Sequence, residues 1–325
     1  MDISTFPIFF HNKPVLVTGG AGFIGSHLID ALCQHGAKVT VLDDLSAGER
    51  DNIAAILPIQ FIQGSLLDTA IVQKAVDGNQ IIFHLAARGS VPMSVEHPVE
   101  FVQANIIGTQ NLLEAARKAN VHRMIFSSSS SVYGSNPIPW IETMPMLPLS
   151  PYAATKAAGE SLLRAYSNSY NLDTCSLRYF NIFGPRQNPD SAYAAVIAAF
   201  AKAALQNKQP VIYGDGLQSR DFTFVANAVH ANLLAAVCAT PIKGEAINVG
   251  CGNPITVNAL AESIGELAGC TNFKPIYKPD RAGDLKHSYA DLTKAKNRLN
   301  YSPVVDLKTG LNTTLQWYRE YSKYG

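Results

Sequence analysis

The sequence predicts an α/β fold in which a doubly wound parallel sheet carries a smaller, interleaved C-terminal domain. Short apolar runs alternate with amphipathic stretches through about the first 180 residues, as in parallel strands joined by helices. The last third instead has frequent turn signals, including "GPRQNP", "YGDG", "GCGNP" and "YKPDRAGD". We therefore expect a main domain over residues 1–180, with returning segments near 221–250, and a second domain mainly over 181–325.

The first unit of the main domain is a strand, a helix and a second strand. The apolar run Val15–Val17 predicts a buried strand. From residue 23 to 34, apolar side chains recur at helical spacing until Gly36 ends the helix. The run "AKVTVLDD" then predicts a second strand, which completes a βαβ unit of about thirty residues.

Three glycines lie at the turn between the first strand and the helix, in the pattern "TGGAGFIG". Gly19 allows a tight turn, Gly22 lets backbone N–H groups approach a pyrophosphate at the helix N-terminus, and Gly25 allows the helix to pack closely on the strand. Asp43 ends the second strand, where its carboxylate can accept hydrogen bonds from the ribose hydroxyls of adenosine. A phosphate on that ribose would be repelled, so the pattern predicts a Rossmann-type domain that binds NAD rather than NADP.

Further strand and helix patterns follow in order. "IQFIQGSLLD", "QIIFHLAA" and "HRMIFSSSSSVYG" predict strands, and residues 99–120 have apolar side chains at helical spacing. Because ligands of such sheets bind beyond the carboxyl ends of the strands, Ser65 and Leu66 are expected to flank the adenine, and the residues after His84 are expected to lie at the cofactor. The pattern continues to about Tyr179.

The strand "MIFSS" leads directly into Ser129, and a YxxxK pattern follows on a predicted helix. Ser129 is therefore expected at the carboxyl edge of the sheet. Tyr152 and Lys156 are four residues apart and share one helix face. A phenol is a poor base at neutral pH, but a neighbouring ammonium group and a nicotinamide cation would favour the phenolate. These residues predict proton transfer by Tyr152 to a substrate oxygen held by Ser129.

These motifs, together with "HLAA" and "RYFNIFGPRQ", resemble the extended short-chain dehydrogenase/reductase family, and nearly the whole chain is covered. Within that family the chain resembles the NAD-dependent nucleotide-sugar 4-epimerases. The resemblance implies catalysis by Ser129, Tyr152 and Lys156, NAD as the cofactor, and no metal. It implies cofactor contacts from Gly19, Gly22, Phe23, Ile24, Asp43, Asp44, Ser46, Gly48, Ser65, Leu66, Leu85, Ala86, Ala87, Tyr152, Lys156 and Tyr179.

The resemblance also bears on the reaction. Dehydratases and decarboxylases of the family carry acidic residues just before "VYG", whereas this chain has Ser130 and Ser131 there. Without an acid or base near carbon 5 or 6 of the sugar, elimination has no evident catalyst. Return of the hydride to the other face of carbon 4 is then the simplest outcome, which is epimerisation.

Substrate contacts are implied by matching motifs. Asn181, Arg220 and Arg281 correspond to positions that hold the UDP diphosphate, and arginine forks suit phosphate. Val196 and Tyr213 are expected at the uracil. The sugar contacts are expected to come from Gly89, Ser90, Ser129, Ser130, Tyr152 and Ser288.

Ser288 corresponds to the position at which glucose-restricted bacterial epimerases carry a bulky tyrosine. A small side chain there leaves room for a 2-acetamido group, and "SVPMS" and "NPDSAYAAVIAAF" also resemble the subgroup that handles N-acetylated sugars, such as UDP-N-acetylglucosamine. A UDP-glucose or UDP-glucuronate 4-epimerase remains an alternative. So do a UDP-sugar dehydratase and a non-catalytic NAD-sensing regulator, although a regulator would not need Ser129, Tyr152 and Lys156 together.

Composition limits the partners and the setting. Twenty-six Lys and Arg balance twenty-five Asp and Glu, with no basic block, so neither nucleic acid nor an anionic membrane surface is an expected partner. The odd number of cysteines, five without CxxC spacing, argues against a disulfide framework. The first residues resemble neither a signal peptide nor a membrane span. We expect a cytoplasmic enzyme of polysaccharide biosynthesis, with residues 99–119 and 152–170 forming the helices of a homodimer.

Overall fold

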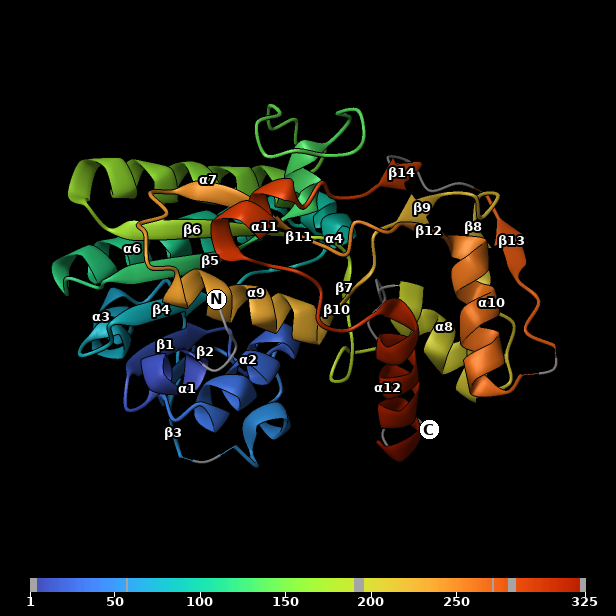
Figure 1. Cartoon of the computed structure of the whole chain (residues 1–325), viewed down its shortest axis with the longest axis horizontal. Coiled ribbons are helices and arrows are strands. Elements are labelled where there is room, and N and C mark those ends of the chain that lie inside the picture. The colour runs from blue at the N-terminus through green and yellow to red at the C-terminus, as the bar shows by residue number, and fades with distance from the viewer. Residues whose placement is uncertain (1–4, 57, 190–195, 271, 280–284, 322–325) are drawn as a thin grey trace.

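The computed structural model describes residues 5–56, 58–189, 196–270, 272–279 and 285–321. Its centre is a seven-stranded sheet in which every neighbouring pair of strands is parallel (Figure 1). The spatial order is β11-β6-β5-β4-β1-β2-β3. These strands are β1 (Pro14–Thr18), β2 (Lys38–Asp43), β3 (Ile59–Gln63), β4 (Ile81–His84), β5 (Arg123–Ser129), β6 (Asp173–Tyr179) and β11 (Glu245–Val249).

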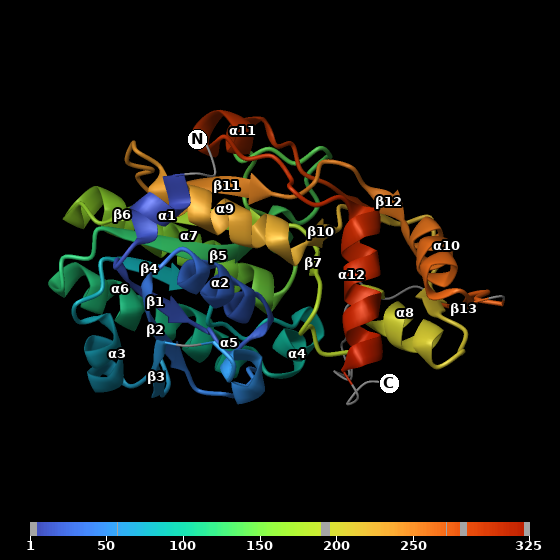
Figure 2. The same ribbon diagram turned by 60° about the horizontal axis from the view of Figure 1, so that its bottom comes forward.

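Helices cover both faces of this sheet (Figure 2). Side chains alternate along each strand, so that Val15 and Val17 point into one core while Leu16 points into the other. The first core lies under α2 and α9, and the second lies under α3, α6 and α7. Their bounds are α2 (Phe23–Gln34), α3 (Thr69–Val76), α6 (Gly108–Lys118), α7 (Pro151–Tyr170) and α9 (Val225–Val237). The predicted Rossmann-type fold is confirmed.

The strand order reverses between β1 and β4, because the chain runs outward from β1 to β3 and then returns to the other side of β1. Loops that leave the carboxyl ends of two such strands diverge, and the gap between them is where ligands bind in open α/β sheets. The other helical segments around the sheet are α1 (Thr5–Phe10), η1 (Arg50–Ile53), α4 (Val91–Glu96), α5 (Pro98–Val102), η2 (Gln103–Ile107), η3 (Ser130–Tyr133) and α11 (Thr293–Leu299).

A second, smaller core lies beside the sheet, on the right in Figure 1. It is built from α8 (Val196–Leu205), α10 (Val257–Ala268) and α12 (Leu307–Glu320). Three small sheets lie outside the large one: β7 (Ile182–Phe183) with β10 (Thr223–Phe224), β9 (Ser219–Arg220) with β12 (Ile255–Thr256) and β14 (His287–Ser288), and β8 (Val211–Tyr213) with β13 (Ile276–Lys278).

Two expectations need correction. Of the segments expected to return to the main domain as strands, residues 245–249 join the large sheet as β11, but residues 220–225 do not. That segment is divided between β9 and β10, because Asp221 between them turns its carboxylate to the backbone N–H groups of Cys251 and Gly252. The helix expected over residues 99–120 is also interrupted, by the π-helical turn η2.

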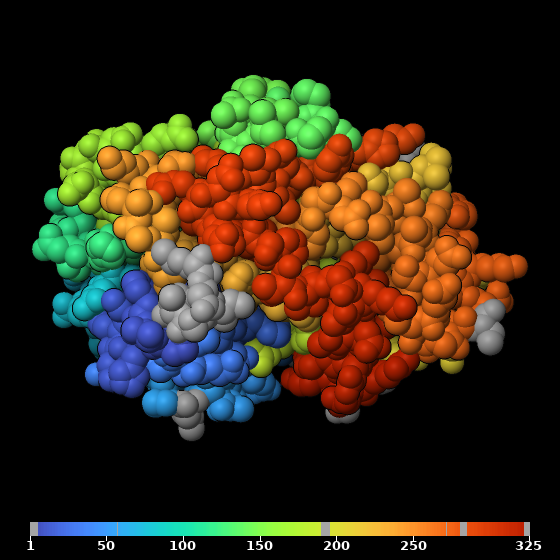
Figure 3. Space-filling view, viewed as in Figure 1, coloured from blue at the N-terminus to red at the C-terminus, as the bar shows by residue number. Residues whose placement is uncertain are grey.

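No helix within the described ranges is both long and apolar enough to cross a membrane. The space-filling view shows one continuous body with a projection at its top, coloured green (Figure 3). This projection is formed by residues 134–149, between η3 and α7.

Candidate active site

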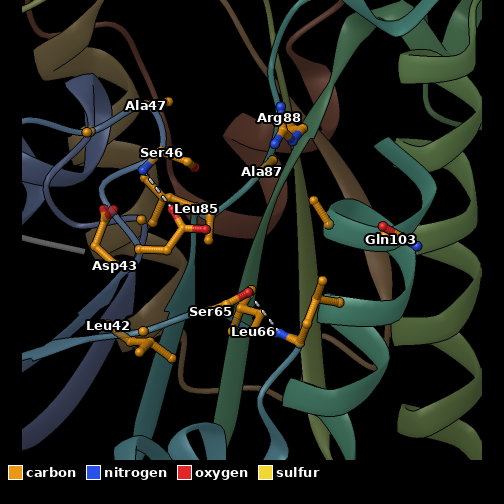
Figure 4. Close-up of a pocket in the computed structure, with 18 of the residues that line it drawn as sticks. Leu42, Asp43, Ser46, Ala47, Ser65, Leu66, Leu85, Ala87, Arg88 and Gln103 are labelled. Carbon is orange, nitrogen blue, oxygen red and sulfur yellow. Dashed lines mark hydrogen bonds between the residues drawn. The ribbon is translucent and has the colours of Figure 1, made fainter. Parts of the chain in front are cut away.

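A cavity of about 360 Å³ lies at the carboxyl ends of β1, β2, β3 and β4, where the strand order reverses. The loop after each of these four strands contributes to its wall, and Figure 4 shows Asp43, Ser65, Leu85 and Arg88 around it. Eleven of the residues predicted to contact the cofactor line this cavity: Gly19, Gly22, Asp43, Asp44, Ser46, Gly48, Ser65, Leu66, Leu85, Ala86 and Ala87.

The glycine turn brings two backbones into close contact. Gly19 has φ +69°, and a Cβ placed on it would lie 2.5 Å from the backbone nitrogen of Ala86. A Cβ on Gly25 would lie 2.2 Å from the carbonyl oxygen of Gly19, so the helix approaches the turn as closely as a glycine permits. The turn therefore leaves the N-terminus of α2 facing the cavity, as binding of a pyrophosphate requires.

Asp43 has a second role that the sequence did not indicate. Its carboxylate accepts hydrogen bonds from the backbone N–H groups of Ala21 at 2.9 Å and Leu45 at 2.8 Å. The carboxylate thus holds the glycine turn against the end of β2. Burial raises the pKa of Asp43, and these two hydrogen bonds oppose the rise. A buried carboxylate at this strand end, beside a turn without side chains, fits the adenosine half of NAD.

A second cavity, of about 610 Å³, adjoins the first. Neighbouring residues line the two cavities: Gly22 lines the first and Phe23 the second, and likewise Arg88 lines the first and Gly89 the second. Ten of the predicted cofactor and substrate residues line the second cavity: Phe23, Ile24, Gly89, Ser129, Ser130, Tyr152, Tyr179, Asn181, Arg220 and Ser288.

Five predicted residues are not among those that line either cavity, and Lys156, one of them, is described below. Ser90 caps α4 and accepts a hydrogen bond from Met93 N at 3.3 Å. Val196 begins α8 and Tyr213 ends β8, both in the smaller region. Arg281 lies outside the described residues.

Ser129 and Tyr152 meet in this cavity. Ser129 is the last residue of β5, and Tyr152 lies in the first turn of α7. The helix begins where it does because Ser150 accepts a hydrogen bond from Ala153 N at 3.2 Å, with a proline in the first turn. The two side chains line the same cavity, and the nearby Ser129 hydroxyl lowers the pKa of Tyr152. A substrate oxygen placed here would contact both hydroxyl groups.

Lys156 lies one helical turn behind Tyr152 and is buried. Its Nζ donates a hydrogen bond to the carbonyl oxygen of Ser127 at 2.7 Å and lies 5.9 Å from the centre of the Tyr152 ring. Burial lowers the pKa of Lys156 to about 7, and the nearby Glu160 opposes this effect.

Burial raises the pKa of Tyr152, and the nearby Ser129 hydroxyl offsets part of that rise. The Lys156 ammonium group is directed to the Ser127 carbonyl, and its buried position makes it easy to deprotonate. The lowering of the Tyr152 pKa expected from this ammonium group together with a nicotinamide cation stays a prediction.

Two other serines of the run bond to the sheet and to α7. Ser127 donates to the Tyr179 hydroxyl on β6 at 3.2 Å, and Ser128 donates to Glu160 on α7 at 2.5 Å. Glu160 in turn forms a buried ion pair with Arg178, at 2.7 Å. Residues 128–131 all line the second cavity, so the run is a strand end and the turn η3 rather than a mobile loop.

Sequence reasoning missed several lining residues. Arg88 and Gly64 line the first cavity, and Trp140 and Gln187 line the second. Arg88 directly follows "HLAA", so its place after a strand could have indicated it. Trp140 lies in the projection and carries no motif, so only the fold reveals it. No group of three or more His, Cys, Asp or Glu among the described residues could hold a metal ion.

Comparison with known proteins agrees with this geometry. Residues 15–250 match the family described as "NAD dependent epimerase/dehydratase family". The chain is 39% identical over 314 residues to a UDP-glucose 4-epimerase of Mycolicibacterium smegmatis, covering 95% of this chain and 99% of the relative.

Two solved structures are similarly close. A UDP-N-acetylglucosamine 4-epimerase from Methanobrevibacter ruminantium, in complex with UDP-N-acetylmuramic acid, superposes with a TM-score of 0.91 at 42% identity, covering 95% of this chain and 99% of that one. A UDP-glucose 4-epimerase of Thermus thermophilus in complex with NAD has a TM-score of 0.86 at 35% identity, covering 95% and 100%.

Proposed function

The chain belongs to the NAD-dependent epimerase/dehydratase family, and we propose that within it the protein interconverts UDP-N-acetylglucosamine and UDP-N-acetylgalactosamine. At the coarser level it is an NAD-dependent UDP-sugar 4-epimerase of the extended short-chain dehydrogenase/reductase type. The choice of an acetamido sugar is the new part of the proposal, and it rests on the wall of the second cavity.

One observation carries this choice. Ser288 is 6% exposed and lines the cavity that also contains Ser129 and Tyr152. It stands on β14, whose partner β9 carries Arg220 directly opposite. If Arg220 holds the diphosphate, a sugar that reaches Tyr152 passes this wall. A serine leaves space there that a tyrosine would fill, so a 2-acetamido group can be accommodated.

The side chains at the carboxyl end of β5 and the start of α7 account for the proton transfer. The residues that line the first cavity would hold NAD, which would supply the acceptor of a hydride from carbon 4 and the donor for its return to the opposite face of the sugar. Ser129 holds the 4-oxygen through its hydroxyl group. Tyr152 takes the proton of the 4-hydroxyl as carbon 4 is oxidised and returns it after the sugar has turned. Lys156 lies behind Tyr152, where it can bind the nicotinamide ribose.

The proposed contacts of the diphosphate come from two residues near the small sheets. Asn181 lies at the end of β6 and donates a hydrogen bond to the Asp221 carbonyl at 3.2 Å. Arg220 lines the cavity, and one nitrogen of its guanidinium group donates a hydrogen bond to the carbonyl of Ser219 at 2.9 Å. This bond holds one end of the guanidinium group in place. A guanidinium in this position suits bidentate binding of phosphate.

The sugar preference is tested by incubating the purified protein, with no NAD added, with UDP-N-acetylglucosamine and separately with UDP-glucose. Product formation is followed by NMR, in the wild type and in Ser288→Tyr. We expect the wild type to convert the acetamido sugar. In Ser288→Tyr its kcat/KM should fall roughly a hundredfold, with UDP-glucose much less affected. Equal losses on both sugars would contradict a gating role, and conversion of UDP-glucose alone by the wild type would contradict the proposed substrate.

We also propose that the protein is a homodimer. Val95 on α4 and Val99 on α5 are 64% and 66% exposed, and Val91 and Val102 on the same helices are exposed as well. Both helices pack against α7, so these valines form an apolar face beside the catalytic helix. A second copy of the chain would bury this face.

The cellular compartment and the pathway are proposed from the state of the cysteines and from the proposed substrate. All five cysteines are free thiols in the structure, as in proteins of a reducing cytoplasm. Nucleotide-activated acetamido sugars are donors for glycan assembly, so we propose a role in supplying polysaccharide biosynthesis.

A further inference from the structure

Asn248 is a fully buried polar residue on β11, between the apolar Ile247 and Val249. Its side-chain amide uses both of its donor hydrogens: Nδ2 donates to the carbonyl oxygen of Trp140 at 2.9 Å and to that of Asp291 at 3.1 Å. Its Oδ1 accepts a hydrogen bond at 2.6 Å from the Tyr133 hydroxyl. A single side chain thus joins three segments that are far apart in sequence.

Two of these segments form one wall of the second cavity. Trp140 N donates to the Tyr289 carbonyl at 3.1 Å, and Asp291 N donates to the Trp140 carbonyl at 3.0 Å. These bonds pair the projection with the residues that directly follow Ser288. Trp140 and Ser288 both line the cavity, and the Trp140 ring is 2% exposed. The pair of segments is called the sugar-side wall below, defined as residues 140 and 288–291.

The other edge of the wall is also fixed. Asp221 N donates to the Ser288 carbonyl at 3.1 Å, so β9 holds Ser288 from the side of Arg220. The backbone of Asn248 contributes again, because its N–H donates to Glu142, two residues beyond Trp140, at 2.8 Å. The position of the wall relative to the sheet therefore depends on Asn248 on one side and on β9 on the other.

The sheet itself does not require an asparagine here. Asparagine is disfavoured in strands, and its apolar neighbours Ile247 and Val249 already pack into the core. A buried amide costs free energy unless it is fully hydrogen-bonded, and Asn248 meets this condition only through the wall and Tyr133. The hydrogen bonds of its side chain therefore serve the wall and Tyr133 rather than the sheet.

We propose that Asn248 is a positioning residue for sugar choice: its amide fixes the sugar-side wall at the distance at which Ser288 and Trp140 enclose a 2-acetamido group. This inference rests on the proposed function. The acetamido group reaches the wall, whereas the shorter 2-hydroxyl group of a glucose unit does not. Loosening the wall should therefore weaken binding of the acetamido sugar and leave glucose nearly unaffected.

The test compares Asn248→Ala with the wild type on UDP-N-acetylglucosamine and UDP-glucose, measuring kcat and KM for each. We expect KM for the acetamido sugar to rise roughly tenfold with little change in kcat, while kcat/KM for UDP-glucose stays within about twofold. Tyr133→Phe is the matched control, because it removes the hydrogen bond to Oδ1 but leaves both bonds from Nδ2 to the wall. Its ratio of kcat/KM values for the two sugars should equal that of the wild type.

If Asn248→Ala does not fold, as judged by its melting temperature and its bound NAD, Asn248→Ser is measured in the same way. A serine hydroxyl has one donor hydrogen and cannot satisfy both carbonyls. Suppose that the wild type converts the acetamido sugar but the variant has the same ratio of kcat/KM values for the two sugars as the wild type. This result would overturn the inference and leave the proposed function standing. A wild type that converts only UDP-glucose would overturn the proposed function and the inference with it.

Discussion

Tyr152 is the residue whose environment most affects the proposed chemistry. Its half-buried ring packs edge-on against Phe101, and it lines the second cavity together with Ser129. Because burial raises its pKa, the hydroxyl remains protonated in the resting protein at neutral pH. The Tyr152 hydroxyl is therefore expected to exchange its proton with the substrate only when substrate and cofactor are both bound.

Replacing Tyr152 with phenylalanine removes the proton-transfer group and little volume. We expect kcat to fall by at least roughly a thousandfold, because positioned acid–base groups contribute on that scale. Bound NAD should be retained, since the ring still fills its place. Rates are measured with the acetamido sugar, and NAD is measured after acid release. Undiminished turnover would remove Tyr152 from this role.

Lys156 gives a pH-dependent prediction for stability. Its folded pKa is about 7, whereas the unfolded chain keeps the ordinary lysine value near 10.4. Between these values the unfolded state binds more protons, so the free energy of unfolding rises with pH across the window. Below pH 7 both states are protonated, and the cost of the buried ammonium group persists.

Lys156→Met removes that cost together with the proposed catalytic function of the lysine. We expect the variant to be inactive, yet to melt a few degrees above the wild type at about pH 6, with the difference shrinking toward pH 10. Lys118→Met is the control, because Lys118 is exposed and pairs only with Glu114 on the surface. A difference between Lys156→Met and the wild type that does not change with pH would contradict the account.

The sequence predicts the chemistry of individual residues well where a motif fixes both type and spacing. Ser129, Tyr152 and Lys156 are brought together, and most of the predicted cofactor residues line one cavity. The pKa of Tyr152 could not be predicted, because it depends on how deeply the fold buries the ring. Trp140 and Asn248 could not be predicted either, since their hydrogen bonds join segments more than a hundred residues apart.

At the scale of elements, the glycine turn after β1 sets the cofactor cavity. Gly19→Ala would place a methyl group against the backbone of Ala86, in a left-handed conformation that alanine disfavours. We expect the purified variant to have lost most of its NAD. Gly78→Ala is the control: Gly78 has a similar φ of +74°, but nothing lies within 4 Å of an added Cβ.

Both glycine variants should lose about 1 kcal/mol of stability from backbone strain, and Gly19→Ala should lose more because its methyl group overlaps the Ala86 backbone, so melting alone does not report loss of the cofactor. NAD content does: full content is expected in Gly78→Ala, and strongly reduced content in Gly19→Ala. Full NAD content in Gly19→Ala would contradict the claim that NAD binding requires the backbones of Gly19 and Ala86 to lie this close together.

Element positions followed from hydrophobic periodicity, but element interruptions did not. The π-helical turn η2 contains Asn105, whose side chain bonds to the Arg88 backbone at 2.8 and 3.1 Å and to Thr155 at 3.0 Å. These contacts bring together the loop after β4 and the catalytic helix α7. Since they are tertiary, the local pattern of residues 99–120 predicted only a regular helix.

At the scale of the whole molecule, the apolar face on α4 and α5 gives a prediction about assembly. We expect the wild type to be a dimer by light scattering, and Val95→Glu/Val99→Glu to be a monomer, because two carboxylates would have to be buried in the interface. Ile8→Glu is the control, since Ile8 is exposed on α1 and lies on a different helix from this face. A monomeric wild type, or a double variant that remains dimeric, would contradict the proposed interface.

The arrangement of the smaller region was the least predictable part of the molecule. Its sheets consist of strands of two or three residues, which carry too little periodicity to be recognised in sequence. The large sheet is different, because its central strands include apolar runs, such as residues 15–17 and 81–83, that are buried on both faces. The cofactor half of the site therefore follows closely from sequence, and the substrate half depends on the fold.

The central claim is that carbon 4 of the sugar loses and regains the same hydrogen on a cofactor that stays bound. It is tested most directly with UDP-N-acetylglucosamine carrying deuterium at carbon 4, incubated with the purified protein and no added NAD, and followed by NMR. The account predicts a galacto epimer that keeps its deuterium at carbon 4. A product that has lost deuterium to solvent hydrogen, or conversion that occurs only with added NAD, would contradict it.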